Sequence, residues 1–321
     1  MSWISPFTLK GMGILGMNRR NHAFVARYNP RCHYPLVDNK LKTKQLASAY
    51  GVPTPTLRFI VSAQHEVRHV NKQLQNGEGF AIKPAKGSGG KGILVISGSR
   101  GNSFIKSSGR RLDERDIQRH ISNILAGLYS LGGTPDTALI EDIIQMDPLF
   151  EGYSHQGIPD IRVIVFQGYP VMAMLRLATE ASDGKANLHQ GAVGVGLDMA
   201  TGKGLRALQF GKPVLLHPDT RKPLDSITIP DWKHLLTLAS RCYEMTGLGY
   251  IGADIVLDRN RGPLMLELNA RPGLAIQMTN GEGLLQRLTA IETLTCNNRN
   301  IDERVSWAME SFGKTKGTTL P

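Results

Sequence analysis

Residues 262–274 of the chain read GPLMLELNARPGL. The stretch begins as an apolar strand at Leu264–Leu266 and then places Glu267, Asn269 and Arg271 at every second position. In an extended chain, side chains two residues apart point to the same face. We therefore predict a strand that brings a carboxylate, an amide and a guanidinium to one face of a sheet.

The preceding apolar segment, Tyr250–Asp258, supplies a hairpin partner for this strand. A turn that is symmetric about Asn260 and Arg261 would place Asp254 directly opposite Glu267. Like charges that face each other across strands, roughly 4.5–5.5 Å apart at Cβ, are destabilising unless one is protonated or a cation lies between them. With the Asn269 oxygen, the pair would suit Mg²⁺, which prefers hard oxygen ligands. The alternative is a solvated strand face with unrelated acids, and the Ile, Val and Leu neighbours favour the metal site.

A second motif is FAIKPAKGSGGKGI at residues 80–93. Its glycines formally match the dinucleotide-binding pattern, but that fold needs a helix next, and the sequence continues as a strand. A Walker A loop is excluded because neither Ser nor Thr follows Lys91. A glycine loop between two strands is a flap whose backbone N–H groups can close over phosphates. A long hairpin turn is the alternative, and Lys83 with the two lysines that flank the glycines favours phosphate contact.

A third set of polar residues lies between these motifs and contains Arg162, Arg176 and Asn187. Single arginines on strands are commonly surface residues or ion-pair partners, so the pattern alone leaves both a structural and a functional reading open.

The remaining sequence predicts a mixture of helices and strands. We expect irregular structure at 1–37, a helix at 38–51 capped by Asp38, a mobile loop at 97–112 and a frayed end at 308–321. The other expected helices lie at 63–75, 113–131 and 229–246, the other strands at 56–61, 80–84, 93–96 and 138–144, a hairpin at 161–175, and loops with short strands at 184–204.

Composition limits the class of protein. The chain has 321 residues, a net charge of +11 and Lys and Arg spread without long runs, which fits a phosphate-handling enzyme at least as well as a nucleic-acid binder. Its three cysteines, Cys32, Cys242 and Cys296, form no metal or disulfide pattern, so we expect reduced thiols. The start has neither a signal peptide nor a membrane span, and a cytoplasmic location is the expectation.

Taken in order, the motifs resemble those of the ATP-grasp superfamily from about residue 38 to 290. The matching pieces are the DNK helix, VPTP, FAIKP with its glycine loop, LIED and GADIVLD…LMLELNARPG. The segments DIRVIVF and NLHQG are similar to RimK-type alpha-L-glutamate ligases, and GMNRRNHAFVARYNPR…PLVDNKLKTK resembles a related subgroup, the sugar-transfer-associated ATP-grasp proteins.

This resemblance implies an α+β ATP-grasp fold in which two subdomains grip ATP between them, with a truncated amino-terminal region. The implied divisions are a short segment at 1–37, a subdomain with the glycine flap at 38–140, a subdomain with the metal site at 141–300 and a tail at 301–321.

The resemblance also implies roles for particular residues. Lys40 and Lys83 would hold ATP phosphates, the loop Ser88, Gly89, Gly90, Lys91 and Gly92 would close over them, and Glu141, Asp142 and Ile144 would lie at the adenine. Asp254, Glu267 and Asn269 would hold two Mg²⁺ ions, with Mn²⁺ as an alternative metal. Arg162, Arg176 and Asn187 would face the acyl phosphate and the acceptor.

The implied activity is an ADP-forming carboxylate–amine ligase that makes an amide through an acyl phosphate, adding glutamate or another amino acid to a peptide or small acid. RimK-type ligases have a small residue where Arg271 stands, so Arg271 would bind a substrate carboxylate or stabilise the tetrahedral intermediate. Because about 37 residues precede Lys40, a partner or a second copy of the chain is one way to complete the acceptor site. The alternatives are a catalytically silent ATP-binding regulatory module and a basic nucleic-acid-binding protein, for which no recognition motif is found.

Overall fold

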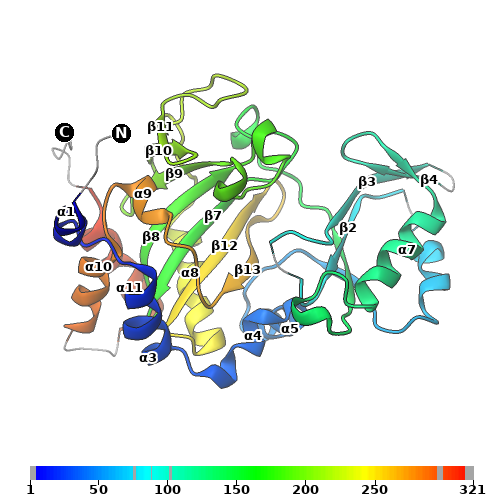
Figure 1. The fold of residues 1–321 in the computed structure, drawn as a ribbon, viewed down its shortest axis with the longest axis horizontal. Helices are drawn as coiled ribbons and strands as arrows, with labels where there is room; N and C mark the ends of the chain where they lie inside the picture. Colours follow the sequence, from blue (N-terminus) through cyan, green and yellow to red (C-terminus); the bar gives the residue numbers. More distant parts are fainter. Residues whose placement is uncertain (1–4, 75–76, 88, 101–102, 295–298, 315–321) are drawn as a thin grey trace. The chain divides into compact units, whose positions relative to one another are not determined.

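A computed structural model describes residues 5–74, 77–87, 89–100, 103–294 and 299–314 of the chain. The chain divides into two compact units. The first contains residues 1–37, 46–53 and 146–321, and the second contains residues 38–45 and 54–145. Each unit is built on one antiparallel sheet (Figure 1). Each also has its own apolar core.

The first unit has a seven-stranded sheet in the order β11-β10-β9-β8-β7-β12-β13. Its strands are β7 (Asp160–Phe166), β8 (Tyr169–Leu177), β9 (Val193–Leu197), β10 (Gly204–Gln209), β11 (Lys212–Val214), β12 (Tyr250–Asp258) and β13 (Gly262–Asn269). Its helices are α1 (Pro6–Gly11), α2 (Met17–Arg19), a π-helix (Arg20–Val25), α3 (Ala26–Tyr28), α8 (Trp232–Thr246), α9 (Ile276–Asn280), α10 (Leu284–Glu292) and α11 (Ile301–Phe312). Helix α8 packs against β7 and β12, and α11 packs against β8, so the central strands are buried in the core.

The second unit has a six-stranded sheet in the order β1-β6-β2-β3-β4-β5. Its strands are β1 (Leu57–Val61), β2 (Phe80–Pro84), β3 (Leu94–Arg100), β4 (Ser103–Lys106), β5 (Arg111–Leu112) and β6 (Ala138–Asp142). The helices α6 (Val70–Leu74) and α7 (Glu114–Leu125) bury apolar side chains with one face of this sheet. Helices α4 (Pro35–Asp38) and α5 (Lys40–Ala49) have residues in both units.

Four local predictions are wrong in the described residues. Residues 1–37 were expected to be irregular but contain α1–α4 and the π-helix. The loop expected at 97–112 is instead the end of β3 followed by β4 and β5. Helix α11 continues to Phe312, into the range 308–321 that was expected to be frayed, and residues 315–321 lie outside the described residues. The cap of α5 is Asn39 rather than Asp38, since the Asn39 side chain accepts hydrogen bonds from the N–H groups of residues 41 and 42.

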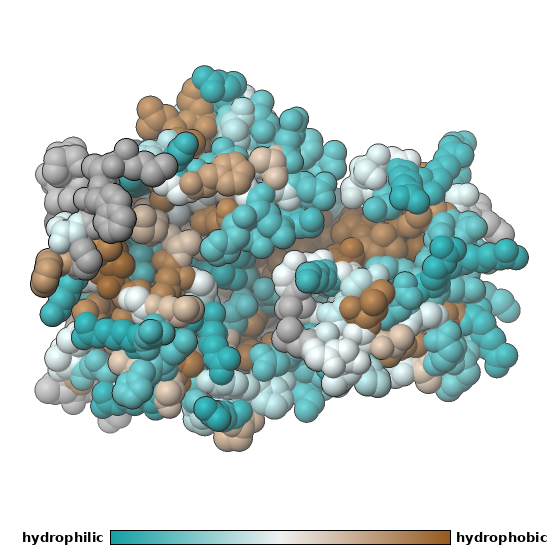
Figure 2. All heavy atoms as spheres, in the orientation of Figure 1, coloured by the Kyte–Doolittle hydropathy of each residue, from teal (hydrophilic) through white to brown (hydrophobic). Residues whose placement is uncertain are grey.

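Hydrophilic residues predominate on the face that Figure 2 shows, with patches of hydrophobic residues between them. Near the β10–β11 hairpin, Phe210 and Leu215 are exposed at 63% and 85%. None of the described helices is both long enough and apolar enough to cross a membrane. Cys32 and Cys242 are free thiols, and Cys296 lies outside the described residues.

Candidate active site

The opening stretch forms β13, and its pairing with β12 is as predicted where it matters for the site. Asp254 lies directly opposite Glu267 in the β12–β13 ladder. The predicted symmetric turn is wrong, because nearer the turn Ile255 pairs with Met265, which leaves Leu266 as an extra residue in a bulge. The bulge moves the pairing by one residue just before the two acids. The face that carries Asp254 therefore also carries Glu267.

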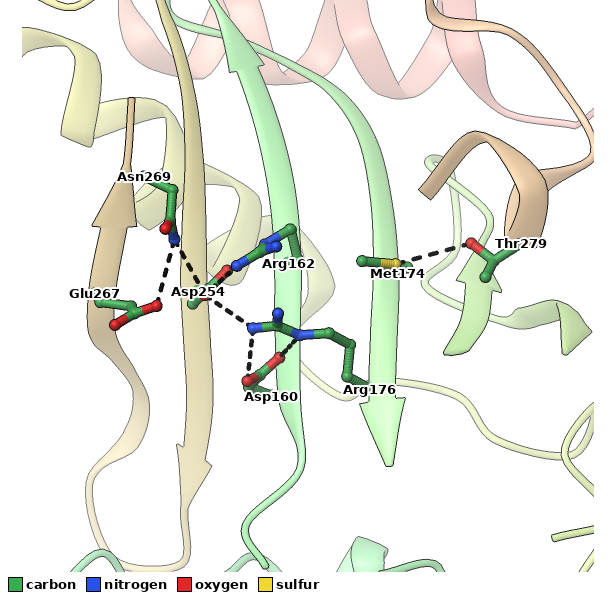
Figure 3. Close-up of polar contacts among 8 residues, drawn as sticks. All are labelled: Asp160, Arg162, Met174, Arg176, Asp254, Glu267, Asn269 and Thr279. Atoms are coloured by element: carbon green, nitrogen blue, oxygen red, sulfur yellow. Dashed lines mark hydrogen bonds and ion pairs between the residues drawn. The ribbon is translucent and has the colours of Figure 1, made fainter. Parts of the chain in front are cut away.

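On the other side of Asp254, the ladder with β7 places Arg162 directly opposite the carboxylate (Figure 3). The Arg162 Nε and Nη2 atoms donate to the two Asp254 oxygens at 2.7 and 2.6 Å, which is the bidentate arrangement that guanidinium and carboxylate favour. Arg176 on β8 donates to Asp254 Oδ2 at 2.8 Å and also pairs with Asp160. Asp254 is only 1% exposed, so these two arginines compensate a buried charge.

This arrangement corrects the electrostatic expectation from the sequence. The cation expected between the facing acids need not be a metal for the fold to tolerate them, because Arg162 and Arg176 already neutralise Asp254. Burial works to raise the pKa of Asp254, but the two arginines outweigh it and hold the pKa at about 2. Burial raises the pKa of Asp160 to about 6 against the pull of Arg176, and the neighbouring Asp254 charge adds to the rise.

The same face has the donor set that a hard divalent cation needs. The Asn269 amide nitrogen lies 3.3 Å from Asp254 Oδ2 and 3.5 Å from Glu267 Oε1, so the three side chains converge (Figure 3). Rotating the amide by half a turn would present its oxygen to the same point, since the two ends of an amide occupy nearly the same space. Within the described residues no three His, Cys, Asp or Glu side chains form a metal cluster, so a third protein ligand from a side chain at this point would be the Asn269 amide. If the Asn269 amide turns its oxygen toward the two acids, the three side chains fit Mg²⁺.

In the second unit, Glu141 is buried and pairs with two lysines. Lys83 on β2 lies 2.7 Å from Glu141 Oε2, and Lys44 on α5 lies 3.0 Å from Glu141 Oε1. Burial works to raise the pKa of Glu141, but Lys83 and Lys44 outweigh it and lower the pKa below its usual value. Lys44 was missed from the sequence, although it lies one helical turn after Lys40 and so shares its face of the predicted helix.

Lys40 and the glycine loop lie together at the start of α5. The Lys40 amine donates to the Gly87 carbonyl at 2.6 Å, and its backbone N–H donates to the Ala85 carbonyl. The loop joins the antiparallel strands β2 and β3, as the sequence predicted. Gly89, Gly90 and Gly92 have positive φ angles, which glycine adopts without strain, and Lys91 is exposed; Ser88 lies outside the described residues.

Several predicted site residues have other contacts. Asn187 caps a short 3₁₀ helix by accepting a hydrogen bond from the His189 N–H at 3.0 Å. Arg271 lies beyond the end of β13 with its guanidinium 5.2 Å from the centre of the Tyr34 ring. The Asp142 N–H, expected at the adenine, donates to the Thr56 carbonyl, and its carboxylate accepts from Arg58. Ile144 follows the end of β6 and is half-buried.

The family is decided by a match that extends over most of the chain. A model of sugar-transfer-associated ATP-grasp proteins matches residues 19–293. The chain belongs to the sugar-transfer-associated ATP-grasp family. The sequence-based recognition is therefore confirmed, and the two antiparallel sheets with a glycine loop between β2 and β3 are the α+β ATP-grasp fold.

Among curated proteins, this ATP-grasp chain is 24% identical over 236 residues to a probable alpha-L-glutamate ligase of Maridesulfovibrio salexigens, covering 74% of the chain and 56% of that protein. It is 23% identical over 253 residues to one of Thioalkalivibrio sulfidiphilus, covering 78% and 62%. The chain thus spans about three fifths of these relatives. D-alanyl-alanine synthetase A of Vibrio cholerae is a similar solved structure, with a TM-score of 0.48, 12% identity and coverage of 87% of this chain and 66% of that one.

Proposed function

We propose that the protein is an ATP- and Mg²⁺-dependent ligase that joins a carboxylate to an amine, releases ADP and passes through an acyl phosphate. The observation that carries this proposal is the convergence of Asp254, Glu267 and Asn269 on one sheet face, next to Arg162 and Arg176. Membership of the ATP-grasp family and the similarity to proteins named as glutamate ligases support the same reaction class.

In this proposal the second unit binds the nucleotide. Lys40, Lys44 and Lys83 provide positive charge for its phosphates, with Glu141 holding Lys44 and Lys83 in place. The backbone N–H groups of Gly89, Gly90, Lys91 and Gly92 serve as the phosphate-covering flap. The chain beyond β6, including Ile144, offers backbone groups to the adenine. The Asp142 N–H is already used by Thr56, so it does not belong to the proposed adenine donors.

In the first unit, Asp254, Glu267 and Asn269 would hold Mg²⁺, which supplies positive charge for phosphoryl transfer when bound. Arg162 and Arg176 keep Asp254 ionised and available as a ligand because they lower its pKa. Their remaining N–H groups can face the negative charge of the acyl phosphate and of the tetrahedral intermediate. In this proposal Asn187 caps the 3₁₀ helix Leu188–Gln190 and has no role in the reaction.

The amine is proposed to be an amino acid, with glutamate as the first candidate, and the acid a peptide or small molecule. The test is to incubate the protein with ATP, Mg²⁺, pooled amino acids and cell extract, and to follow ADP release and product mass. We expect ADP release that needs an acceptor, with a product whose mass equals acid plus amine minus water. ATP binding without ADP release for any acceptor would instead favour the silent regulatory module.

A further inference from the structure

Arg20, in the π-helix Arg20–Val25, is a buried cation. Arg20 is 6% exposed. Its Nη1 donates a hydrogen bond to the Pro272 carbonyl, and its Nε donates to Asn21 Oδ1 at 2.8 Å. No carboxylate pairs with it in the described part of the chain. A buried guanidinium with only neutral partners is costly, and an anionic ligand would offset that cost. π-Helical turns are also common at functional sites.

The contact with Pro272 places Arg20 beside the face that carries the proposed metal ligands. Gly252 lies opposite Asn269 and two residues before Asp254, so all three positions share one face of the sheet. A Cβ at Gly252 would lie 2.7 Å from Pro272 Cβ, which shows that the chain after β13 folds back over this face. The Pro272 carbonyl that holds Arg20 therefore belongs to a segment that covers the sheet next to Asp254.

Two more polar groups, which have no carboxylate or hydrogen-bond partner within the described ranges, lie near Arg20. Arg271, next to Pro272, is exposed and contacts the Tyr34 ring. Tyr250 is fully buried on the same face as Gly252 and Asp254, and among the described residues its hydroxyl has no hydrogen-bond partner. Burial lowers the pKa of Arg20, Tyr250 opposes this change, and the charge of Arg271 lowers it further, so the two guanidiniums are close enough to repel.

We propose that Arg20 and Arg271, with the Tyr250 hydroxyl, form a subsite for the carboxylate of the amine substrate. An amino acid that is joined through its amine keeps a free carboxylate, which needs positive charge to be held next to a phosphate-rich site. Two guanidiniums and a hydroxyl supply planar donors and charge for such a group. This inference rests on the proposed ligase function and assigns a substrate group to residues outside the metal and nucleotide sites.

The test compares Arg271→Gln and Arg20→Gln with the wild type, using L-glutamate and its α-amide as probes of ADP release. We expect the KM for glutamate to rise by about 10- to 100-fold, as for loss of a charge-assisted hydrogen bond, and the KM for MgATP to stay unchanged. The α-amide should bind weakly to the wild type, and its affinity should fall little further in the variants. Arg20→Lys should recover part of the affinity. Arg19→Gln, an exposed neighbour, is the matched control.

Binding is measured in parallel by saturation-transfer NMR with L-glutamate and then with a pool of amino acids. If the wild type binds amino acids but releases no ADP, and Arg271→Gln loses this binding, the subsite is supported and the proposed ligase function is contradicted. ADP release with unchanged glutamate KM in both variants overturns the subsite while the function stands. Equal losses for glutamate and its α-amide, or no amino-acid binding at all, also overturn it. If Arg20→Gln does not fold, the exposed Arg271 variant decides.

Discussion

A substitution at Glu267 should change the proposed chemistry but not the stability of the fold. The facing Asp254 is already neutralised by Arg162 and Arg176, so the Asp254 charge stays paired when the Glu267 charge is removed. We expect Glu267→Gln to lower Mg²⁺-dependent ADP release by at least about 100-fold, as for loss of a group that stabilises transition-state charge. The midpoint of urea unfolding should stay close to that of the wild type.

The matched control for this variant is Glu151→Gln, because Glu151 is an exposed acid of the same unit that pairs with Arg259 at the surface. Its ADP release should equal that of the wild type. Full activity in Glu267→Gln would remove the metal assignment, whereas loss of activity together with unfolding would show a structural role.

Asp160 should make stability depend on pH. Its pKa is raised by burial to about 6 in the folded chain, against an ordinary value near 4 in the unfolded chain. Between these values the folded chain holds a proton that the unfolded chain has lost, so the contribution of Asp160 to the free energy of unfolding falls as pH rises through this window. Asparagine does not titrate. We therefore expect the stability of Asp160→Asn relative to wild type to be higher at pH 7 than at pH 4.

Urea unfolding at these two pH values measures the difference, with Asp183→Asn as the control because the Asp183 side chain is 93% exposed. A relative stability of Asp160→Asn that is the same at both pH values, or lower at pH 7, would contradict the raised pKa. The opposite shift belongs to Asp254, whose lowered pKa contributes stability that is lost only as pH falls below about 4.

At this scale the sequence predicted contacts along one hairpin but not across the whole sheet. The hairpin and the opposition of Asp254 and Glu267 were predicted, but the bulge at Leu266 that brings the two acids into register was not. The neutralisation of Asp254 by Arg162 depends on β7 lying beside β12, and its pairing with Arg176 depends on β8 coming next. That strand order is set by packing of the whole unit, so single arginines in the sequence could not be assigned to ion pairs.

At the scale of elements, the segment after β13 should be fixed by its contact with Gly252. A Cβ added at Gly252 would come within 2.7 Å of Pro272 Cβ, while one added at Gly273 would meet open space. Gly252→Ala should therefore destabilise the chain by about 1–3 kcal/mol, as overpacking does, and Gly273→Ala should change stability little. Chemical denaturation of the two variants checks this contrast. Equal stability of the two would mean that Pro272 moves freely off the sheet.

Elements with strong local signals were predicted from the sequence, and those stabilised by distant contacts were not. β2 and the strands of the β12–β13 hairpin have near-continuous apolar runs and form as expected, although the turn and the bulge of the hairpin differ from the prediction. Residues 97–112 are polar and rich in Gly and Ser, yet β4 forms there by pairing with the extended β3, and β5 forms by pairing with β4. The helices before residue 38 have weak patterns, but Phe24 and Val25 are buried in the core of the first unit.

At the scale of the whole molecule, the order of motifs identified the ATP-grasp fold, and composition alone did not. A net charge of +11 fits several anionic partners. The first unit also gathers residues 1–37, 46–53 and 146–321, so its extent depends on contacts between segments that are far apart in the chain. Arg20 is an example, because its position beside Pro272 joins residues 252 positions apart and no local pattern predicts it.

Nucleotide binding should stabilise the full chain against heat. A ligand that binds only the folded state adds about 2.7 kcal/mol of apparent stability at 100 times its dissociation constant. MgATP should therefore raise the unfolding temperature measured by differential scanning fluorimetry. Because the chain is basic, inorganic tripolyphosphate is needed as a control for non-specific anion binding. It should raise the unfolding temperature less than MgATP does, and high salt should abolish this increase.

Lys83→Ala tests whether the effect arises at the nucleotide site. Glu141 keeps Lys44 as a partner at 3.0 Å in this variant, so its charge stays paired and the fold should survive. We expect the MgATP shift to fall strongly in Lys83→Ala and the small tripolyphosphate effect to be unchanged. An equal shift with both anions, insensitive to Lys83, would mean that the chain binds polyanions through net charge. That result would favour a basic nucleic-acid-binding protein over an ATP-dependent ligase.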